Sequence, residues 1–269
     1  MRASILVGLL LLMFTSAGCG DGGWNMFKTT PNFYPTAQQN YEYGLTELKG
    51  SNWLVAIQFF EHVKKNFGFS KYATLAELGL ADANLGREKY TEAIEGYKQF
   101  IKAHPSNERV TDGYAPFKIC QCYMKEIPSD WLLAPPAYEK DQGPVVDAMR
   151  ELETFMTDYH DSPHRAQAEK YLAQAIQRIA DHELYVAKFY LDRNHPYAAI
   201  GRLEHLVREY PSSKREPETL LLLGKTYMKM NKLDLAKTAF EKLRNEHPED
   251  FRAGKAQLYI DFINAKPKS

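Results

Sequence analysis

Residues 223–248 read LGKTYMKMNKLDLAKTAFEKLRNEHP, and this stretch decides the fold. Its small and apolar residues recur three or four positions apart, which is the spacing of one face of an α-helix. Pro248 closes the stretch, because proline cannot continue a helix. The stretch predicts two antiparallel helices, with landmarks at Leu223, Gly224 and Tyr227 in the first and at Ala236, Phe240 and Leu243 in the second.

The second-helix pattern occurs five times along the chain. Each copy has an Ala, then an aromatic residue or Leu four positions later, then a bulky apolar residue three positions further on. Twelve residues after the Ala, four copies have Gly or Pro and the third has His160. A small residue lets two helix axes approach, and the large residue fills the space beside it. The other copies are Ala56, Phe60, Val63; Ala93, Tyr97, Phe100; Ala148, Leu152, Phe155; and Ala199, Leu203, Leu206.

These landmarks resemble those of the tetratricopeptide repeat (TPR), a helix pair of 34 residues. We therefore predict an all-α TPR solenoid of five helix pairs over residues 37–265, with a capping C-terminal helix at residues 252–265 and a polar tail at residues 266–269. Residues 127–143, rich in Pro and charge, predict a loop inside the third pair. Residues 164–191 contain no Gly and have a helical period, which predicts one helix about 42 Å long.

The N-terminus has the features of a bacterial lipoprotein signal. A basic start, a short apolar run at residues 5–14 and the small residues before Cys19 predict a signal peptide at residues 1–18. The arrangement resembles a lipobox, so Cys19 is the predicted lipidation site, although an ordinary cleaved signal with an incidental Cys is the alternative. Residues 19–36 predict a lipidated tether, and by resemblance to sorting rules Gly20 favours the outer membrane.

Composition excludes several function classes. The 269 residues contain 34 Lys and Arg and 34 Asp and Glu, a balance that argues against a nucleic-acid partner. Three Cys cannot form a disulfide framework. Cys120 and Cys122 have one residue between them, so they point to different helix faces and predict buried thiols, not a metal or redox site. His182-Glu183 lacks the second His of a zinc protease. We expect no enzyme, no catalytic residues, no metal and no cofactor.

A longer resemblance covers residues 37–247, which are similar to the BamD family of outer-membrane protein assembly factors. It rests on ordered strings, with departures at Phe67-Gly68, at residues 138–140 and at Cys120, where the family has Gly in the third first helix. The strings include WLVAI at 53–57, SKYA at 70–73, LADA at 80–83, YTEAI at 90–94, HELYVA at 182–187 and AAI at 198–200. The resemblance implies a periplasm-facing, lipid-anchored scaffold of the β-barrel assembly machinery. Its implied partners are the barrel-inserting subunit, other assembly lipoproteins and unfolded outer-membrane proteins.

A TPR solenoid presents its first helices on one face, where extended peptides bind. The standard repeat positions predict a groove of aromatic and mildly polar residues, although packing between repeats is the alternative for many of them. By resemblance, this groove would bind targeting segments, and Arg202 would contact the barrel-inserting subunit through its periplasmic domains; a solvated helix charge is the alternative for Arg202. The groove candidates are Gln38, Tyr41, Leu45, Leu78, Asp82, Tyr114, Phe117 and Gln121.

Two other functions fit a TPR lipoprotein. One is a pilotin for a secretin or another envelope complex. The other is a peptidoglycan hydrolase with a TPR arm, but few residues remain outside the repeats to build a catalytic domain.

Overall fold

A computed structural model describes residues 31–128 and 135–265. The chain divides into two units, residues 1–32 and 33–269, and the fold below is that of the second unit. The predicted signal peptide, Cys19, most of the tether and the polar tail lie outside the described residues. Within the described ranges, no helix is both long and apolar enough to cross a bilayer.

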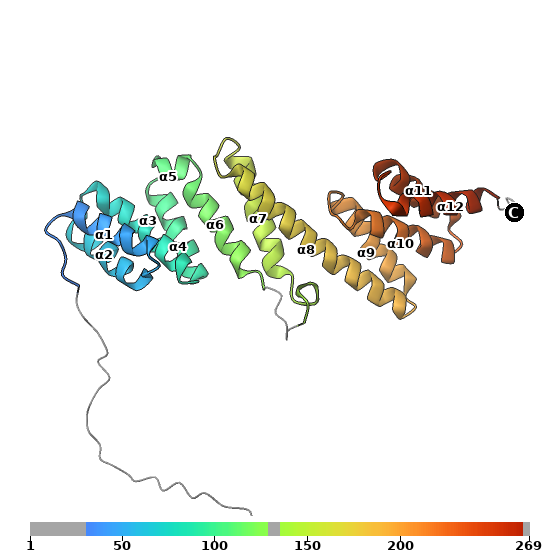
Figure 1. Ribbon diagram of the computed structural model, residues 1–269, viewed down its shortest axis with the longest axis horizontal. Coiled ribbons are helices and arrows are strands. Elements are labelled where there is room, and N and C mark those ends of the chain that lie inside the picture. Colours follow the sequence, from blue (N-terminus) through green and yellow to red (C-terminus); the bar gives the residue numbers. More distant parts are fainter. Residues whose placement is uncertain (1–30, 129–134, 266–269) are drawn as a thin grey trace, which may run out of the picture. The chain divides into compact units, whose positions relative to one another are not determined.

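The described part of the second unit is built of helices, which confirms the all-α prediction of five pairs and a final helix (Figure 1). Each first helix packs against its own second helix, and each pair packs against the next. The first helices are α1 (Ala37–Lys49), α3 (Lys71–Gly86), α6 (Tyr114–Glu126), α8 (Arg165–Asp192) and α10 (Glu216–Lys229). The second helices are α2 (Trp53–Asn66), α4 (Tyr90–Ala103), α7 (Gly143–Asp158), α9 (Pro196–Glu209) and α11 (Leu233–Glu246). The final helix is α12 (Phe251–Ala265).

The landmark residues form the core. All five landmark Ala residues are 0 % exposed, and so are the large residues four positions later. The Phe60 ring shows why small residues occur on the neighbouring first helices. A Cβ added to Gly44 of α1 or to Gly79 of α3 would lie 2.7 Å from the ring of Phe60. One aromatic ring therefore packs against its own pair and the next first helix, as the repeat pattern predicts.

Helix α8 contains 28 residues, as predicted, and belongs to two neighbourhoods. It packs against α7 of the third pair and against α9 of the fourth. Ion pairs join its second half to α10 and the residue before it. The Arg215 Nε lies 2.5 Å from an Asp181 oxygen, and the Lys188 Nζ lies 2.5 Å from a Glu218 oxygen.

Two short elements were not predicted. Helix α5 (Glu108–Thr111) begins after Asn107, whose side chain accepts a hydrogen bond from the Arg109 backbone N–H. The predicted loop at residues 127–143 contains η1 (Ala137–Glu139), and its last residue is already the first of α7. The loop is held against α8, because the Arg178 guanidinium donates to the Pro128 carbonyl at 2.6 Å.

The end of the predicted tether packs on the first helix pair. The Phe33 ring stacks on His62 with centroids 3.8 Å apart, and it meets Phe59 edge-on at 5.2 Å. The Asn40 side chain is fully buried and donates to the Tyr34 carbonyl, while the Tyr34 N–H donates back to it. Ordered packing thus starts before α1.

Candidate binding groove

Four helices bring polar aromatic and charged groups together near the N-terminal end of the solenoid. Tyr41 comes from α1, Asp82 from α3, Arg109 from α5 and Tyr114 from α6. Burial raises the pKa of Tyr41, the nearby Asp82 carboxylate raises it further, and Arg109 lowers it. Burial and Asp82 raise the pKa of Tyr114, and Tyr41 adds to the rise. Three of these four residues are predicted groove residues, so the repeat positions do converge in space.

Asp82 is the centre of this group. One of its carboxylate oxygens accepts a hydrogen bond from the Tyr97 hydroxyl at 2.6 Å, and both accept from the Tyr114 hydroxyl at 3.1 Å. Burial raises the pKa of Asp82, while the two tyrosine hydroxyls, Lys118 and Arg109 act in the opposite direction. The carboxylate therefore joins the fully buried Tyr97 ring of the core to the half-buried Tyr114 ring of the surface.

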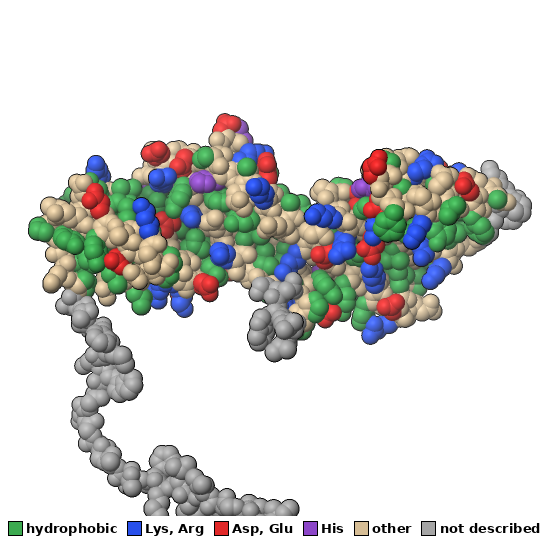
Figure 2. All heavy atoms as spheres, viewed as in Figure 1, with side chains coloured by type: hydrophobic (Ala, Val, Ile, Leu, Met, Phe, Trp, Pro, Cys, Tyr) green, Lys and Arg blue, Asp and Glu red, His purple; other side chains and the backbone are tan. Residues whose placement is uncertain are grey.

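Cations surround the half-buried rings. The Lys71 ammonium lies 5.2 Å from the centre of the Tyr72 ring. The Arg109 guanidinium and the Lys118 ammonium each lie 5.3 Å from the Tyr114 ring centre. Tyr72 and Tyr41 are in contact, with centroids 5.6 Å apart. On the face seen in Figure 2, basic side chains are interspersed with hydrophobic ones over both halves of the solenoid.

The other predicted groove residues differ in exposure. Gln38 is exposed and donates to Glu42, while Leu45 and Gln121 are half-buried. Leu78 and Phe117 are only 6 % and 4 % exposed, so they belong to the core and cannot reach a ligand. The Phe117 ring is buried in contact with the rings of His164 and Tyr171, both nearly parallel to it, with centroids 4.9 and 6.0 Å away. Helical spacing places both residues on the first-helix face, but it does not show which ones the next helix covers.

Four side chains of this site were not predicted from the sequence: Tyr72, Arg109, Lys118 and His164. Arg109 lies on the short helix α5, which has too few residues to show a period. Lys118 directly follows the predicted groove residue Phe117, and Tyr72 was noted only as part of the family string SKYA at residues 70–73. Burial lowers the pKa of His164, and Lys118 and Arg109 lower it further, against Asp112.

Arg202 occupies a different place, on α9 of the fourth pair. Its guanidinium donates to both oxygens of Glu183, at 3.1 and 3.2 Å. The Glu183 side chain is only 9 % exposed, whereas that of Arg202 is 45 % exposed. Arg202 therefore neutralises a buried carboxylate and still presents part of its guanidinium to solvent.

Outside the groove, a hollow of about 430 Å³ lies on α10 and α12. It is lined by Met228, Lys255, Leu258, Tyr259 and Phe262. Leu258 and Phe262 expose more than half of their surface, so the final helix leaves an apolar face in contact with solvent.

Two clusters of side chains carry the residue types of redox or metal sites. Cys120 and Cys122 are buried and free, and burial raises the pKa of Cys122 to about 12. Glu216, Glu246 and His247 place ligand atoms within 4.8 Å of one another among the described residues. The Lys242 ammonium lies 3.0 Å from a Glu216 oxygen, so a side-chain cation already neutralises this carboxylate.

The chain is similar in sequence to a known protein family. Residues 35–243 match the sequence profile of the YfiO family, described as an outer membrane lipoprotein. An outer membrane protein assembly factor BamD from Pasteurella multocida is 26 % identical over 203 residues, covering 75 % of this chain and 78 % of that one. A BamD from Vibrio cholerae is 23 % identical, covering 87 % and 94 %. The solved TPR2AB domain of yeast Sti1 in complex with pHSP90 aligns with a TM-score of 0.41 and 14 % identity, covering 84 % of each chain.

Proposed function

Since this chain belongs to the YfiO family of outer membrane lipoproteins, we propose that it is a non-enzymatic scaffold for the assembly of outer-membrane proteins. Its named relatives are outer membrane protein assembly factors. In this proposal the N-terminal groove binds targeting segments of unfolded outer-membrane proteins, and the C-terminal pairs bind the periplasmic domains of the barrel-inserting subunit. Other assembly lipoproteins complete the complex.

The observation that carries the proposal is the pairing of tyrosine rings with cations around Asp82. Tyr41, Tyr72 and Tyr114 offer aromatic faces to the aromatic side chains of a peptide. Arg109 and Lys118 offer charge to a carboxylate, and Arg can bind one through two hydrogen bonds. The hydroxyls of Tyr97 and Tyr114 donate to Asp82, so they are engaged within the protein. Such a surface binds and releases an extended segment without chemistry.

Peptide binding is tested with a synthetic barrel C-terminal segment and the full mature chain. Replacing Tyr41 and Arg109 by Ala should weaken binding about tenfold or more, since aromatic and Arg anchors dominate interfaces. Phe69→Ala, at a fully exposed ring outside the groove, is the matched control and should bind like the parent. Equal affinity for all three chains would remove the groove from the proposal.

Docking of the barrel-inserting subunit is proposed to use Arg202. Charge reversal is a poor test, because it would place two carboxylates together at Glu183. Arg202→Gln combined with Glu183→Gln removes both charges and leaves no uncompensated buried ion. Reduced recovery of the barrel subunit with this double variant, in a chain that still binds the peptide, supports the contact. Unchanged recovery removes Arg202 from the interface.

Lipidation at Cys19 and an outer-membrane, periplasm-facing location are parts of the same proposal. Mass spectrometry of the purified protein should find a diacylglyceryl-modified, N-acylated Cys19, and Cys19→Ser should move the chain to the soluble periplasmic fraction. Co-purification from detergent-solubilised envelopes then separates the two scaffold functions. Recovery of a β-barrel insertase supports assembly, whereas recovery of a secretin ring would identify a pilotin.

A further inference from the structure

Exposed apolar residues recur near the start of the second helices, at positions that the groove does not use. Three of the five second helices have one two residues before the landmark Ala, and α11 has one a single residue before it. They are Leu54, Val146, Tyr197 and Leu235, each between 46 % and 71 % exposed. The second helix of the second pair has Thr91 there.

Folding does not explain this row. The first turn of an exposed helix favours acidic and polar side chains, because backbone N–H groups and the helix dipole point outward there. Helices α2, α7 and α9 have no acidic residue in that turn. Single exposed apolar residues are ordinary, but three in the same register, with Leu235 one position further on, are a pattern.

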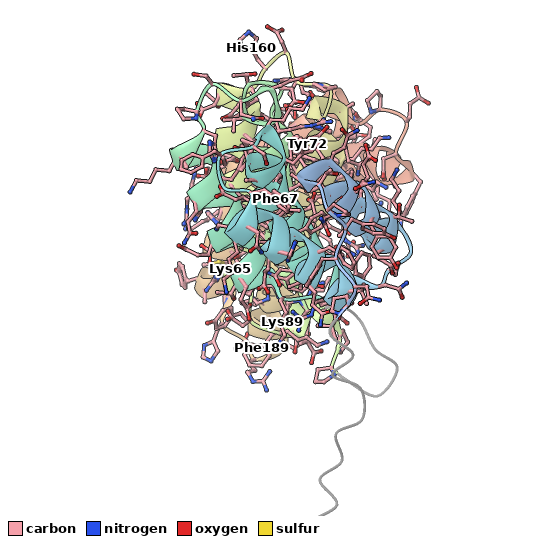
Figure 3. The ribbon with its side chains drawn as sticks, turned by 90° about the vertical axis from the view of Figure 1, so that its left-hand side faces the viewer. Lys65, Phe67, Tyr72, Lys89, His160 and Phe189 are labelled. Atoms are coloured by element: carbon pink, nitrogen blue, oxygen red, sulfur yellow. The ribbon has the colours of Figure 1, made fainter. Side chains whose placement is uncertain are left out.

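The row lies where first helices turn into second helices. In Figure 1 the α3–α4 and α8–α9 turns lie along the same edge of the second unit. Figure 3, turned by 90°, places Lys89 and Phe189 at one edge and His160 at the opposite one. We use "turn edge" for Phe189, Arg193, Tyr197, Lys232 and Leu235, which belong to the last two of these turns.

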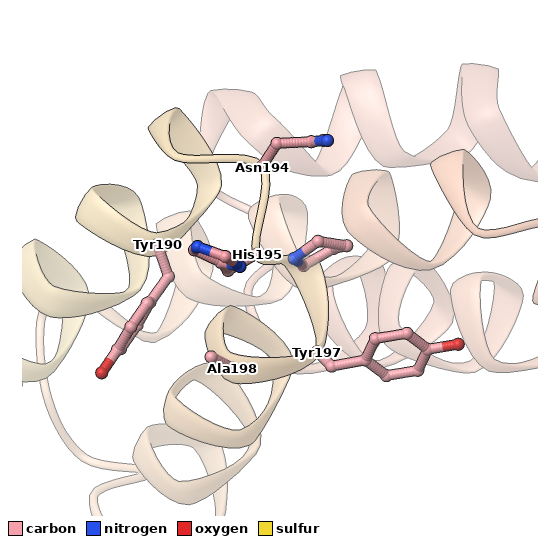
Figure 4. Close-up of a pocket in the computed structure, with 6 residues that line it drawn as sticks. Tyr190, Asn194, His195, Tyr197 and Ala198 are labelled. Carbon is pink, nitrogen blue, oxygen red and sulfur yellow. The ribbon is translucent and has the colours of Figure 1, made fainter.

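Aromatic rings and cations are paired on the turn edge. The Arg193 guanidinium lies 3.6 Å from the centre of the Phe189 ring, and the Lys232 ammonium lies 5.3 Å from that of Tyr197. Because Lys232 belongs to the next turn, the two turns are neighbours. Tyr190, His195 and Tyr197 help to line a hollow of about 620 Å³, and the Tyr197 ring points away from the Tyr190 ring (Figure 4).

We propose that the turn edge lies on the surface of a bilayer that contains anionic lipids. Rings with a polar tip or a cation beside them are the side chains that settle at the headgroup level of membranes. The residues project from helix tips, so they suit a deformable planar partner better than a protein pocket. The family is described as an outer membrane lipoprotein, and the lipid anchor of the proposed function, on which this inference rests, would hold the chain beside such a surface.

Charge adds to the apolar contact. The two turns contain Arg193, Lys229 and Lys232 but also Asp192 and Asp234, so the net charge of these five residues is small. Each cation near an anionic surface strengthens binding about fivefold at low salt. The contact therefore orients a chain that its lipid holds in place, and it leaves the groove residues untouched.

The test uses the full mature chain with Cys19→Ser, so that no acyl chain masks the protein's own affinity. It is mixed with vesicles of phosphatidylethanolamine with about a quarter phosphatidylglycerol, or with phosphatidylcholine vesicles, and floated. We expect flotation with the anionic vesicles that weakens with salt. Tyr197→Ser with Leu235→Ser should reduce binding about tenfold. Arg193→Gln with Lys232→Gln removes two cations and should reduce it about 25-fold at low salt, on anionic vesicles only.

Phe69→Ser is the matched control, because its ring is fully exposed and lies in the loop between α2 and α3. It should float like the parent, and every variant should keep the parent's melting temperature and peptide affinity. No flotation of the parent, or an equal loss with Phe69→Ser, would overturn the proposal. If the Tyr197 and Leu235 variant floats normally but loses an envelope protein on co-purification, the edge is a protein interface and the bilayer proposal is wrong. Peptide affinity reports separately on the groove.

Discussion

Replacing Asp82 by Ala should destabilise the chain and weaken peptide binding together. The substitution removes the acceptor for the Tyr97 hydroxyl, which is buried, and for the Tyr114 hydroxyl. Hydrogen bonds to a charged group contribute about 1.5–3 kcal/mol each. Against this, removal of the carboxylate ends the desolvation that raises the pKa of Asp82. We expect a net loss of about 2–3 kcal/mol in the free energy of unfolding.

Urea unfolding followed by circular dichroism measures this loss, and two variants control it. Asp82→Asn keeps an acceptor of the same shape without the charge and should cost less than about 1 kcal/mol. Asp147→Ala removes an exposed carboxylate paired with Arg150 and should cost at most about 0.5 kcal/mol. An Asp82→Ala chain as stable as the Asp147→Ala chain would refute the reasoning. Full peptide affinity of the Asp82→Ala chain would also refute it, because the position of the Tyr114 ring would then not depend on its hydrogen bond to Asp82.

The pH dependence of the same pair has a definite sign. The pKa of Asp82 is raised in the folded chain, so the folded state binds more protons than the unfolded state just above pH 3.8. The ionised form is the less stable one, and the parent loses stability as pH rises through the folded pKa. The Asp82→Asn chain lacks this loss, so its stability relative to the parent should improve from pH 4 towards neutrality. A difference that stays flat would contradict the direction of the pKa shift.

Three further predictions use other parts of the chain. Gly79→Ala places a Cβ 2.7 Å from a fully buried ring and should cost about 1–3 kcal/mol, whereas Gly201→Ala, with open space around it, should stabilise α9 by up to about 1 kcal/mol in the same urea assay. Phe33→Ala removes the ring stacked on His62; because burial lowers the pKa of His62, NMR titration should show that pKa rising towards 6.5. Burial raises the pKa of Cys122 to about 12, so a maleimide should label the native thiol at least about a hundredfold more slowly than the urea-unfolded one, and fast native labelling would contradict its burial.

The fold could be predicted because its determinants are local and periodic. The Ala and large apolar landmarks lie on one helix face, so their spacing alone places Ala56 and Phe60 in the core. Residues 164–191 predicted α8 because no Gly interrupts the helical period there. The described ends of the third pair's loop lie where its Pro content predicts them. Within it, η1 contacts α8 through the Arg178 guanidinium, which donates to the Ala137 carbonyl at 3.2 Å, and no local pattern encodes that contact.

The groove could be predicted only by position. Tyr41, Asp82 and Tyr114 come together because the repeat places their helices side by side. The hydrogen bonds that Asp82 accepts from two tyrosine hydroxyls could not be predicted, because those tyrosines lie 15 and 32 residues away in the sequence. The pairing of Arg202 with Glu183 is similar, since both residues were noticed in sequence but their contact crosses from α9 to α8.

Helix α8 has a consequence for how this chain can change during evolution. Repeat arrays gain and lose units by recombination, and a junction survives when the crossover falls in a loop, because each unit contacts only its neighbours. The first and second pairs, and the fourth and fifth, are separated by such loops. A loop at residues 159–164 also separates the third and fourth pairs, but α8 divides its contacts along its 28 residues. Ala168 and Ala175 in its first half pack with the third pair, whereas Ala180 and Leu184 in its second half pack with the fourth and fifth. A first helix of ordinary length inserted at this loop could not make both sets of contacts, so this junction accepts new repeats less readily than the others.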